Sequence, residues 1–198
     1  MKNKNRIICI FFGIILLCGG CGKSEKIANP ESYETILTKM EGNSDIHSKL
    51  LIFPEPEMVM EYIKDCNYIE QEGLFDGIYQ LSIICDYDNE TYEEEKQRLG
   101  NITVSYNGSE QSVLCKTTES GYWTYITIYD HAGTYEYAML DEANRTIIYV
   151  FSQLGNLQDI VDEKYVIDQS DVENEINSAF NIYYFPDKEG DGYSFIDE

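Results

Sequence analysis

Positive charge is scarce in this sequence. Its 198 residues include 14 Lys and Arg against 36 Asp and Glu, so the formal net charge is −22. Nucleic-acid-binding proteins neutralise phosphates with basic patches, and polybasic segments bind anionic lipid in the same way. The composition therefore argues against nucleic acid as a partner and against electrostatic adhesion to a membrane. The acidity instead favours solubility through self-repulsion.

The residues and motifs that carry most enzyme chemistry are also missing. The chain has two histidines, His47 and His131, and the second lies in a polar turn. There is no G-x-S-x-G, H-E-x-x-H, Gly-rich phosphate loop or Cys-His signature. After residue 21 there is also no C-x-x-C or Cys/His cluster with zinc spacing. We therefore predict no catalytic residue, no cofactor and no metal site, and we expect a protein that is not an enzyme.

No apolar run is long enough to span a bilayer comfortably. The stretch from Ile7 to Leu17 is about half of the ~20 residues that a transmembrane helix needs. It follows a basic segment and precedes the small pair Gly19-Gly20. A basic region, a short apolar region and small residues before a cut are typical of a secretory signal peptide. We assign this role to residues 1–20.

The segment Gly19-Gly20-Cys21 resembles the lipobox of bacterial lipoproteins, in which the cysteine is lipidated and becomes the mature N-terminus. The resemblance implies that Cys21 carries the lipid, including palmitate, and holds the protein at the extracytoplasmic face of the cell membrane. Cys18 stands where lipoboxes usually have Leu, and the alternatives are simple secretion or an uncleaved anchor. Loss of the leader removes three basic residues and no acid, so the net charge falls from −22 to −25.

Three cysteines follow Cys21 in the mature chain, and an odd number cannot all pair internally. They are Cys66, Cys85 and Cys115. Cys85 lies in an apolar strand-like run and reads as a small buried hydrophobe. A Cys66–Cys115 or a Cys66–Cys85 disulfide are both open alternatives.

The clearest structural pattern runs from Tyr122 to Gln153. Three β-branched and aromatic runs are separated by the turn segments 130–133 and 141–144, which is the pattern of an antiparallel meander. The third run, from Ile147 to Phe151, is apolar on both faces, which predicts a central strand. We therefore predict an α+β fold: an antiparallel β-sheet of about five to seven strands, built on this meander, with one or two packed helices.

Other segments extend this fold. We predict helices over 31–40 and 90–99, the second capped by Asp88-Asn89 and supported by a Glu94–Arg98 pair. Strands are expected over 49–53, 78–87, 102–106 and 112–117, with a hairpin turn at Asn107-Gly108, whereas 57–70 fits either a helix or a strand. The chain then divides into a signal peptide (1–20), a tether with a candidate helix (21–44), a single domain (45–185) and an acidic tail (186–198).

These motifs, in this order, resemble those of a group of small uncharacterised proteins of low-GC Gram-positive bacteria. The resemblance covers residues 48–153 and implies a Gram-positive, membrane-anchored setting, without implying an activity. The segments that carry it are Leu51-Ile52-Phe53-Pro54, Tyr79-Gln80-Leu81, Tyr92 with Glu95 and Arg98-Leu99, Thr127-Ile128-Tyr129, Thr134-Tyr135-Glu136-Tyr137-Ala138 and Ile147-Ile148-Tyr149-Val150-Phe151.

Two stretches could bind a ligand. Asp187 to Glu198 resembles an EF-hand calcium loop, with oxygen ligands at alternate positions and Gly192 at the sharp turn. Against this, the chain ends at the twelfth loop position, so the competing interpretation is an acidic tail. The second stretch is a row of aromatic side chains, which serves as a platform for glycan or peptide if exposed and as core if buried. That row comprises Trp123, Tyr125, Tyr129, Tyr135 and Tyr137; the need to bury one sheet face favours core.

The leading functional expectation is a non-catalytic, membrane-anchored lipoprotein that binds an unknown protein or envelope ligand. One alternative is a hydrolase that acts on envelope material through acidic residues; with 36 acids, neighbouring carboxylates arise by chance and do not identify a site. A cleft with two facing carboxylates would favour that alternative. The other is a calcium-responsive surface module built on residues 187–198.

Overall fold

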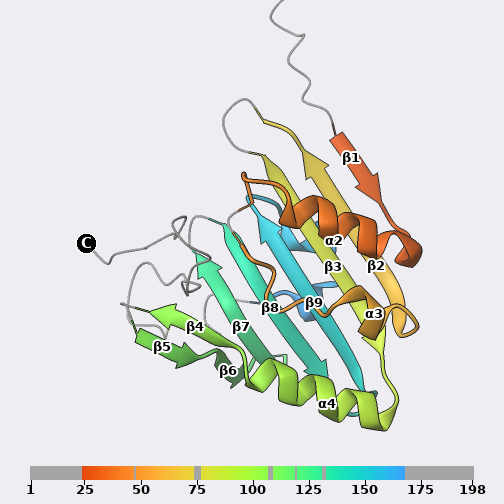
Figure 1. Ribbon diagram of the computed structural model, residues 1–198, viewed down its shortest axis with the longest axis vertical. Helices are drawn as coiled ribbons and strands as arrows, with labels where there is room; N and C mark the ends of the chain where they lie inside the picture. The colour runs from red at the N-terminus through yellow and green to blue at the C-terminus, as the bar shows by residue number, and fades with distance from the viewer. Residues whose placement is uncertain are drawn as a thin grey trace, which may run out of the picture.

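The computed structural model describes residues 24–46, 48–73, 77–106, 109–118, 120–130 and 133–167. They form the predicted α+β fold, in which a seven-stranded antiparallel sheet has the order β1-β2-β3-β9-β8-β7-β6 and carries helices on one face (Figure 1). The strands of this sheet are β1 (Ser24–Ile27), β2 (Ile63–Gln71), β3 (Ile78–Asp86), β6 (Leu114–Thr117), β7 (Trp123–Asp130), β8 (Thr134–Asp141) and β9 (Thr146–Gln153). The helices are α2 (Tyr33–Glu41), α3 (Pro56–Val59) and α4 (Asn89–Gly100).

The predicted meander is confirmed as β7, β8 and β9. Strand β9 pairs with β8 on one side and with β3 on the other, and every residue of β9 is buried. This is the central position that the apolar pattern of Ile147–Phe151 predicted, because both of its faces are covered.

Helices cover one face of the sheet. Ile36 and Met40 of α2 and Leu99 of α4 pack against strand residues such as Leu81 and Phe151, and all of these side chains are buried. The predicted helices are both confirmed, since apolar side chains at helical spacing had a sheet face to cover. Figure 1 shows α2 and α3 in front of the sheet and α4 along one end of it.

The last described segment covers the opposite face. It contains the 3₁₀ helices η2 (Leu157–Asp159) and η3 (Glu163–Tyr165), and Ile160 between them is buried against residues such as Ile148 and Val150. The Ser82 hydroxyl donates a 2.7 Å hydrogen bond to the Ile160 carbonyl, which fixes the segment to β3. Two faces of one sheet are therefore buried by different means, helices on one side and a loop on the other.

A bulge in β7 divides the aromatic row between these two faces. The register shifts between Ile126 and Ile128, so Tyr125 packs with the helices while Tyr129 packs with the opposite cluster. The aromatic residues of β7 therefore do not share one face of the sheet, as a continuous row would require. A bulge adds one residue to a strand and reverses the facing of everything after it.

The strand expected over 49–53 is wrong. The segment is a loop in which Leu50 has a left-handed φ of 52°. Its backbone is bound by side chains: the Ile52 N–H donates to the buried Glu136 carboxylate at 2.9 Å, and Arg98 donates to the Ile52 carbonyl at 2.7 Å. Because side chains satisfy these backbone groups, the segment needs no partner strand.

The segment 21–44, expected as a tether with a candidate helix, contains regular structure from Ser24 onward. Strand β1 pairs with the end of β2, and the 3₁₀ helix η1 (Pro30–Ser32) follows it. The ambiguous stretch 57–70 resolves into the end of α3 and most of β2. A hairpin forms from β4 (Thr103–Tyr106) and β5 (Ser109–Ser112) as a separate two-stranded sheet. The strand expected over 112–117 as its partner is instead β6, which pairs with β7 in the main sheet.

Helix α4 begins as its sequence predicts. The Asp88 side chain accepts hydrogen bonds of 2.9 Å from the backbone N–H groups of Glu90 and Thr91. The ion pair expected between Glu94 and Arg98 is replaced by one between Glu95 and Arg98, at 2.6 Å. Within the described ranges, no helix has the length and apolarity that crossing a membrane requires.

Candidate functional site

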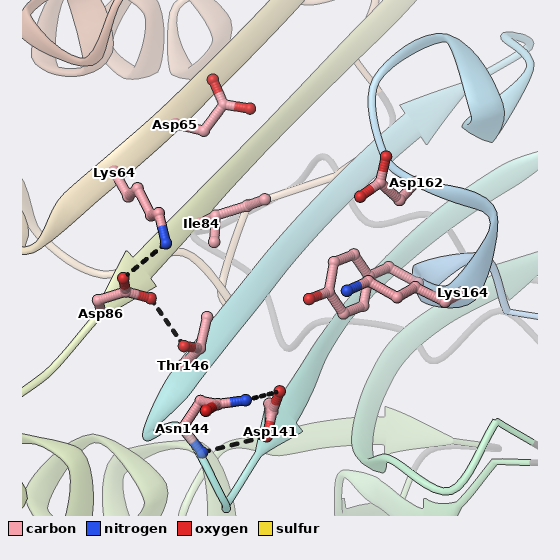
Figure 2. Close-up of a pocket in the computed structure, with 10 residues that line it drawn as sticks. Lys64, Asp65, Ile84, Asp86, Asp141, Asn144, Thr146, Asp162 and Lys164 are labelled. Carbon is pink, nitrogen blue, oxygen red and sulfur yellow. Dashed lines mark hydrogen bonds and ion pairs between the residues drawn. The ribbon is translucent and has the colours of Figure 1, made fainter.

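An open groove of about 730 Å³ lies on the sheet face opposite the helices, at one end of the central strands. Figure 2 shows it between the ends of β2, β3 and β9, the β8–β9 turn and the segment around η3. Its lining residues are Lys64, Asp65, Ile84, Asp86, Asp141, Asn144, Thr146, Asp162, Lys164 and Tyr165. Carboxylates and ammonium groups therefore face one space from four separate segments, and β9 adds the Thr146 hydroxyl.

Asp86, at the end of β3, is held from two sides. The Thr146 hydroxyl of β9 donates to it at 2.7 Å, and the Lys64 ammonium of β2 forms an ion pair with it at 3.0 Å. Partial burial alone would raise the pKa of Asp86, but these hydrogen bonds outweigh it and lower the pKa below its usual value. Asp86 is therefore ionised at neutral pH, a poor starting state for a general acid.

The turn between β8 and β9 forms a second wall. The Asp141 carboxylate accepts hydrogen bonds from the backbone N–H of Asn144 at 3.2 Å and from its side-chain amide at 2.8 Å. On β2, Asp65 accepts from the Cys66 N–H and from the Asn67 amide, each at 3.0 Å. Both carboxylates are thus oriented by their own segments.

The facing wall comes from η3. The Lys164 ammonium lies 4.4 Å from the centroid of the Tyr165 ring, a cation–π contact. The Tyr165 ring packs against Tyr122 at 5.4 Å between centroids, and its carbonyl accepts a 2.8 Å hydrogen bond from the buried Tyr137 hydroxyl. Asp162 begins η3 and is exposed at the groove. The segment around η3 therefore presents one cation, Lys164, and one anion, Asp162, to the groove.

The groove combines both signs of charge with an apolar floor of Ile84 and Tyr165. Such a lining suits a polar ligand with charged groups, whose orientation a few fixed side chains define. Among the residues that the structure describes, no three His, Cys, Asp or Glu side chains are grouped closely enough to hold a metal ion. The chemistry available is recognition through ion pairs and hydrogen bonds.

Two buried carboxylates lie away from the groove, on the helix face. Burial raises the pKa of Glu136 to about 7, partly offset by hydrogen bonds from Ser48 and the Ile52 N–H. Glu95 accepts from Arg98 at 2.6 and 2.8 Å and from the Tyr149 hydroxyl at 2.8 Å. Neither lines the groove. Glu136 binds the Ile52 N–H directly, whereas Glu95 holds Arg98, which donates to the Ile52 carbonyl, so the role of both acids is structural.

The aromatic row is mostly core. Tyr125 and Tyr129 are buried on opposite faces, Tyr137 is fully buried, and Trp123 alone of the row is strongly exposed, at 41%. The preferred interpretation of this row as core is confirmed, and a continuous aromatic platform is wrong. A ligand platform needs several exposed rings on one face.

Several predicted positions lie outside the described residues: Cys21, His47, His131 and the segment 187–198. The three cysteines that follow Cys21 are described, and all are free thiols, so neither of the two disulfides is present. Burial raises the pKa of Cys66 to about 12 and that of Cys115 to about 11, which leaves both protonated and unreactive at neutral pH.

Sequence reasoning did not single out the groove residues. Asp86 and Thr146 are 60 positions apart and meet only because β3 and β9 are neighbours. The local signals were present: a polar Asp ends a strand at position 86, and a turn pattern covers 141–144. A local sequence pattern does not show which strands pair, and the pairing of β3 with β9 is what brings Asp86 and Thr146 together.

Comparison with known proteins adds no assignment. No family model matches this chain, and no curated protein or solved structure is significantly similar to it.

Proposed function

We propose that this protein is a lipoprotein, anchored through Cys21 at the extracytoplasmic face of the cell membrane, and that it acts as a non-catalytic binding module. Its ligand is a polar, charged group on a protein or envelope component, and it binds in the groove lined by Asp86 and Lys164. The observation that carries this proposal is the position of the groove at the end of the sheet remote from Ser24.

The strand registers support this arrangement. Ser24, which follows Cys21 by three positions, pairs with Gln71, and Gln71 pairs with Ile78. At the other end of the same sheet, Asp86 pairs with Thr146, and both line the groove. The eight residues of β9 correspond to about 23 Å of strand. An anchor at Cys21 would therefore leave the groove facing away from the membrane.

The groove favours binding over hydrolysis. Asp86 is tied to Lys64 and Thr146 and has a lowered pKa, whereas acid catalysis needs a proton-carrying carboxyl at neutral pH. Glu136, whose pKa is raised, is completely buried on the far side of the sheet. An ionised carboxylate that is held by an ion pair and a hydroxyl suits recognition.

Anchoring is tested by Cys21→Ala in the native host. Wild-type protein is expected in the membrane fraction with a lipid-modified N-terminus by mass spectrometry. The variant is expected in the leader-bearing form or in the medium, without lipid. If wild type and variant are distributed equally between membrane and medium, and the wild type carries no lipid, the proposed anchor is wrong.

Binding is tested by cross-linking full-length protein in native membranes and comparing Lys164→Glu with Lys49→Glu. Both lysines are exposed, and both substitutions change the charge equally, but only Lys164 lines the groove. We expect the cross-linked species of wild type to persist with Lys49→Glu and to disappear with Lys164→Glu. Identical species for all three proteins would show that the groove is not the binding site.

A further inference from the structure

The distance between the proposed anchor and the folded domain is limited by covalent geometry. Cys21 and Ser24 are three residues apart, and Ser24 already belongs to β1, paired with Gln71 of β2. Three residues span at most about 11 Å, even when fully extended. A lipid on Cys21 therefore brings the Ser24 end of the sheet close to the bilayer surface.

Several chain segments reach this same end of the sheet, which is called the anchor-side end below. Tyr79 and Thr134 both pair with Gln153, the last residue of β9. Leu154 follows, and its N–H donates a 2.9 Å hydrogen bond to the Gly133 carbonyl. The turn is held by strand pairing on both sides.

Leu154 presents an apolar side chain at this turn. It is 43% exposed and has a left-handed φ of 58°, a conformation that Gly or Asn adopts more readily than a large apolar residue. Among the described residues, the other strongly exposed large apolar side chains are Met58, Met60 and Trp123. A neighbouring hydrocarbon boundary would favour Leu154 at this turn, because apolar side chains gain free energy there.

The charge distribution argues against the sheet edge as the membrane-facing surface. The outer side of β1 leads into η1 and α2, which carry the exposed acids Glu31, Glu34 and Glu41. Anionic lipids would repel them. At the anchor-side end, Glu25 and Glu70 are both ion-paired with Lys39, which leaves Glu72 as the exposed acid beside Gln71.

We infer that the anchor-side end of the sheet rests on the lipid bilayer that holds the anchor, with Leu154 in the interface and the groove pointing outward. This inference rests on the proposed lipidation of Cys21 and extends it to a defined orientation. The occupant of this surface is lipid, because a lipidated Cys21 lies within about 11 Å of Ser24 at the same end of the sheet.

The chain offers a convenient probe of this orientation. Trp123 is its only tryptophan and is 41% exposed. It pairs with Leu140, which pairs with Ile147, so it lies at the end of the sheet remote from Leu154. The double variant Trp123→Phe/Leu154→Trp moves the single indole from the remote end to the anchor-side end.

The experiment uses full-length lipidated protein, purified from membranes and reconstituted into phosphatidylcholine vesicles with bromine on the acyl chains. Bromine quenches an indole only at close range. We expect fluorescence of Trp123→Phe/Leu154→Trp to be quenched several times more strongly than that of wild type. Trp123→Phe/Gln71→Trp provides a second probe at the same end, since Gln71 is exposed and pairs with Ser24.

The outcomes separate the two proposals. Flotation with the vesicles and lipid on Cys21, but no quenching of either anchor-side indole, overturns the orientation and leaves the anchor intact. Equal quenching of wild type and variants also overturns it. Absence of both flotation and lipid modification overturns the anchor and the orientation together. Circular dichroism of each variant verifies that the fold is retained.

Discussion

At the scale of single residues, the helix face depends on two carboxylates that water does not reach. Glu136 is fully buried on β8 and accepts hydrogen bonds from Ser48 and from the Ile52 N–H. Ile52 lies 84 positions before Glu136 in the sequence. A buried carboxylate is stable only when such donors replace its hydration. The protonation of Glu136 therefore depends on groups that are close in space but distant in sequence.

Glu136→Gln tests this protonation. The folded-state pKa of Glu136, about 7, lies above the ordinary value of 4.5. Its contribution to the free energy of unfolding is therefore full below the lower pKa and is lost as pH rises through the higher one. Gln keeps a carbonyl acceptor for Ile52 and cannot ionise. Between about pH 5 and pH 8, wild type should lose on the order of 2 kcal/mol relative to the variant.

Denaturant unfolding at several pH values measures this difference. Glu34→Gln, an exposed position on α2, serves as the control and should follow the wild-type curve. If wild type and Glu136→Gln have parallel pH curves, the carboxyl does not titrate with a raised pKa.

At the scale of elements, α4 fixes the loop that passes beneath it. Arg98 donates to the carbonyls of Leu51 and Ile52 at 3.2 and 2.7 Å while it is paired with Glu95. Helix periodicity places Glu95 and Arg98 on one side of α4, three positions apart. The loop thus replaces an expected strand because the helix supplies its hydrogen-bond donors.

Arg98→Met should destabilise the fold strongly, because Glu95 would keep a buried charge without its partner. We expect a loss of about 3 kcal/mol, the lower end for such a pair, since the Arg98 side chain is 29% exposed. Thermal and urea unfolding would measure it. Glu95→Gln/Arg98→Met should recover part of the loss, whereas exposed Glu94→Ala should lie within about 0.5 kcal/mol of wild type. No recovery in the double variant would contradict the role of the unpaired charge.

The segment 157–167 is expected to stabilise the opposite face of the sheet, as α4 stabilises the helix face. Ile160 is 4% exposed and belongs to the cluster that covers β8 and β9. Ile160→Ala should cost about 2–4 kcal/mol of unfolding free energy through lost burial and a residual cavity. Gln158→Ala, two positions away and exposed, is the matched control. Equal unfolding midpoints would mean that this segment is not part of the cooperative fold.

At the scale of the whole molecule, charge repulsion opposes compactness. The full chain has a net charge of −22, and loss of residues 1–20 makes it −25. Folding brings these charges closer together, and salt screens exposed charges over a Debye length of about 10 Å at 0.1 M. The same excess of acid would discourage the domain from lying flat on anionic lipid.

Added sodium chloride should therefore raise the thermal unfolding midpoint of the mature domain. We expect most of the increase below about 0.3 M, where the screening length changes most. Differential scanning fluorimetry over a salt series would record it, with sucrose at matched osmolality as the control. A midpoint that falls with salt would instead indicate that attractive ion pairs, such as Lys39 with Glu25, dominate.

The sequence by itself determined the α+β class, the meander, β3 and both longer helices. These follow from hydrophobic periods of 2 and 3.6 residues, which are local properties of the chain. Asp88 as the cap of α4 was equally predictable, because a cap and its helix are adjacent.

Only the tertiary structure decided the rest. The bulge in β7 moved Tyr129 to the face opposite Tyr125, Glu136 and Arg98 bind the backbone of 49–53 as a loop, and sheet order brought Asp86 to Thr146. Each outcome depends on contacts between residues far apart in the chain, and a local pattern contains no information on which distant group will satisfy a backbone or side-chain donor. The groove belongs to this second class, because five separate segments line it.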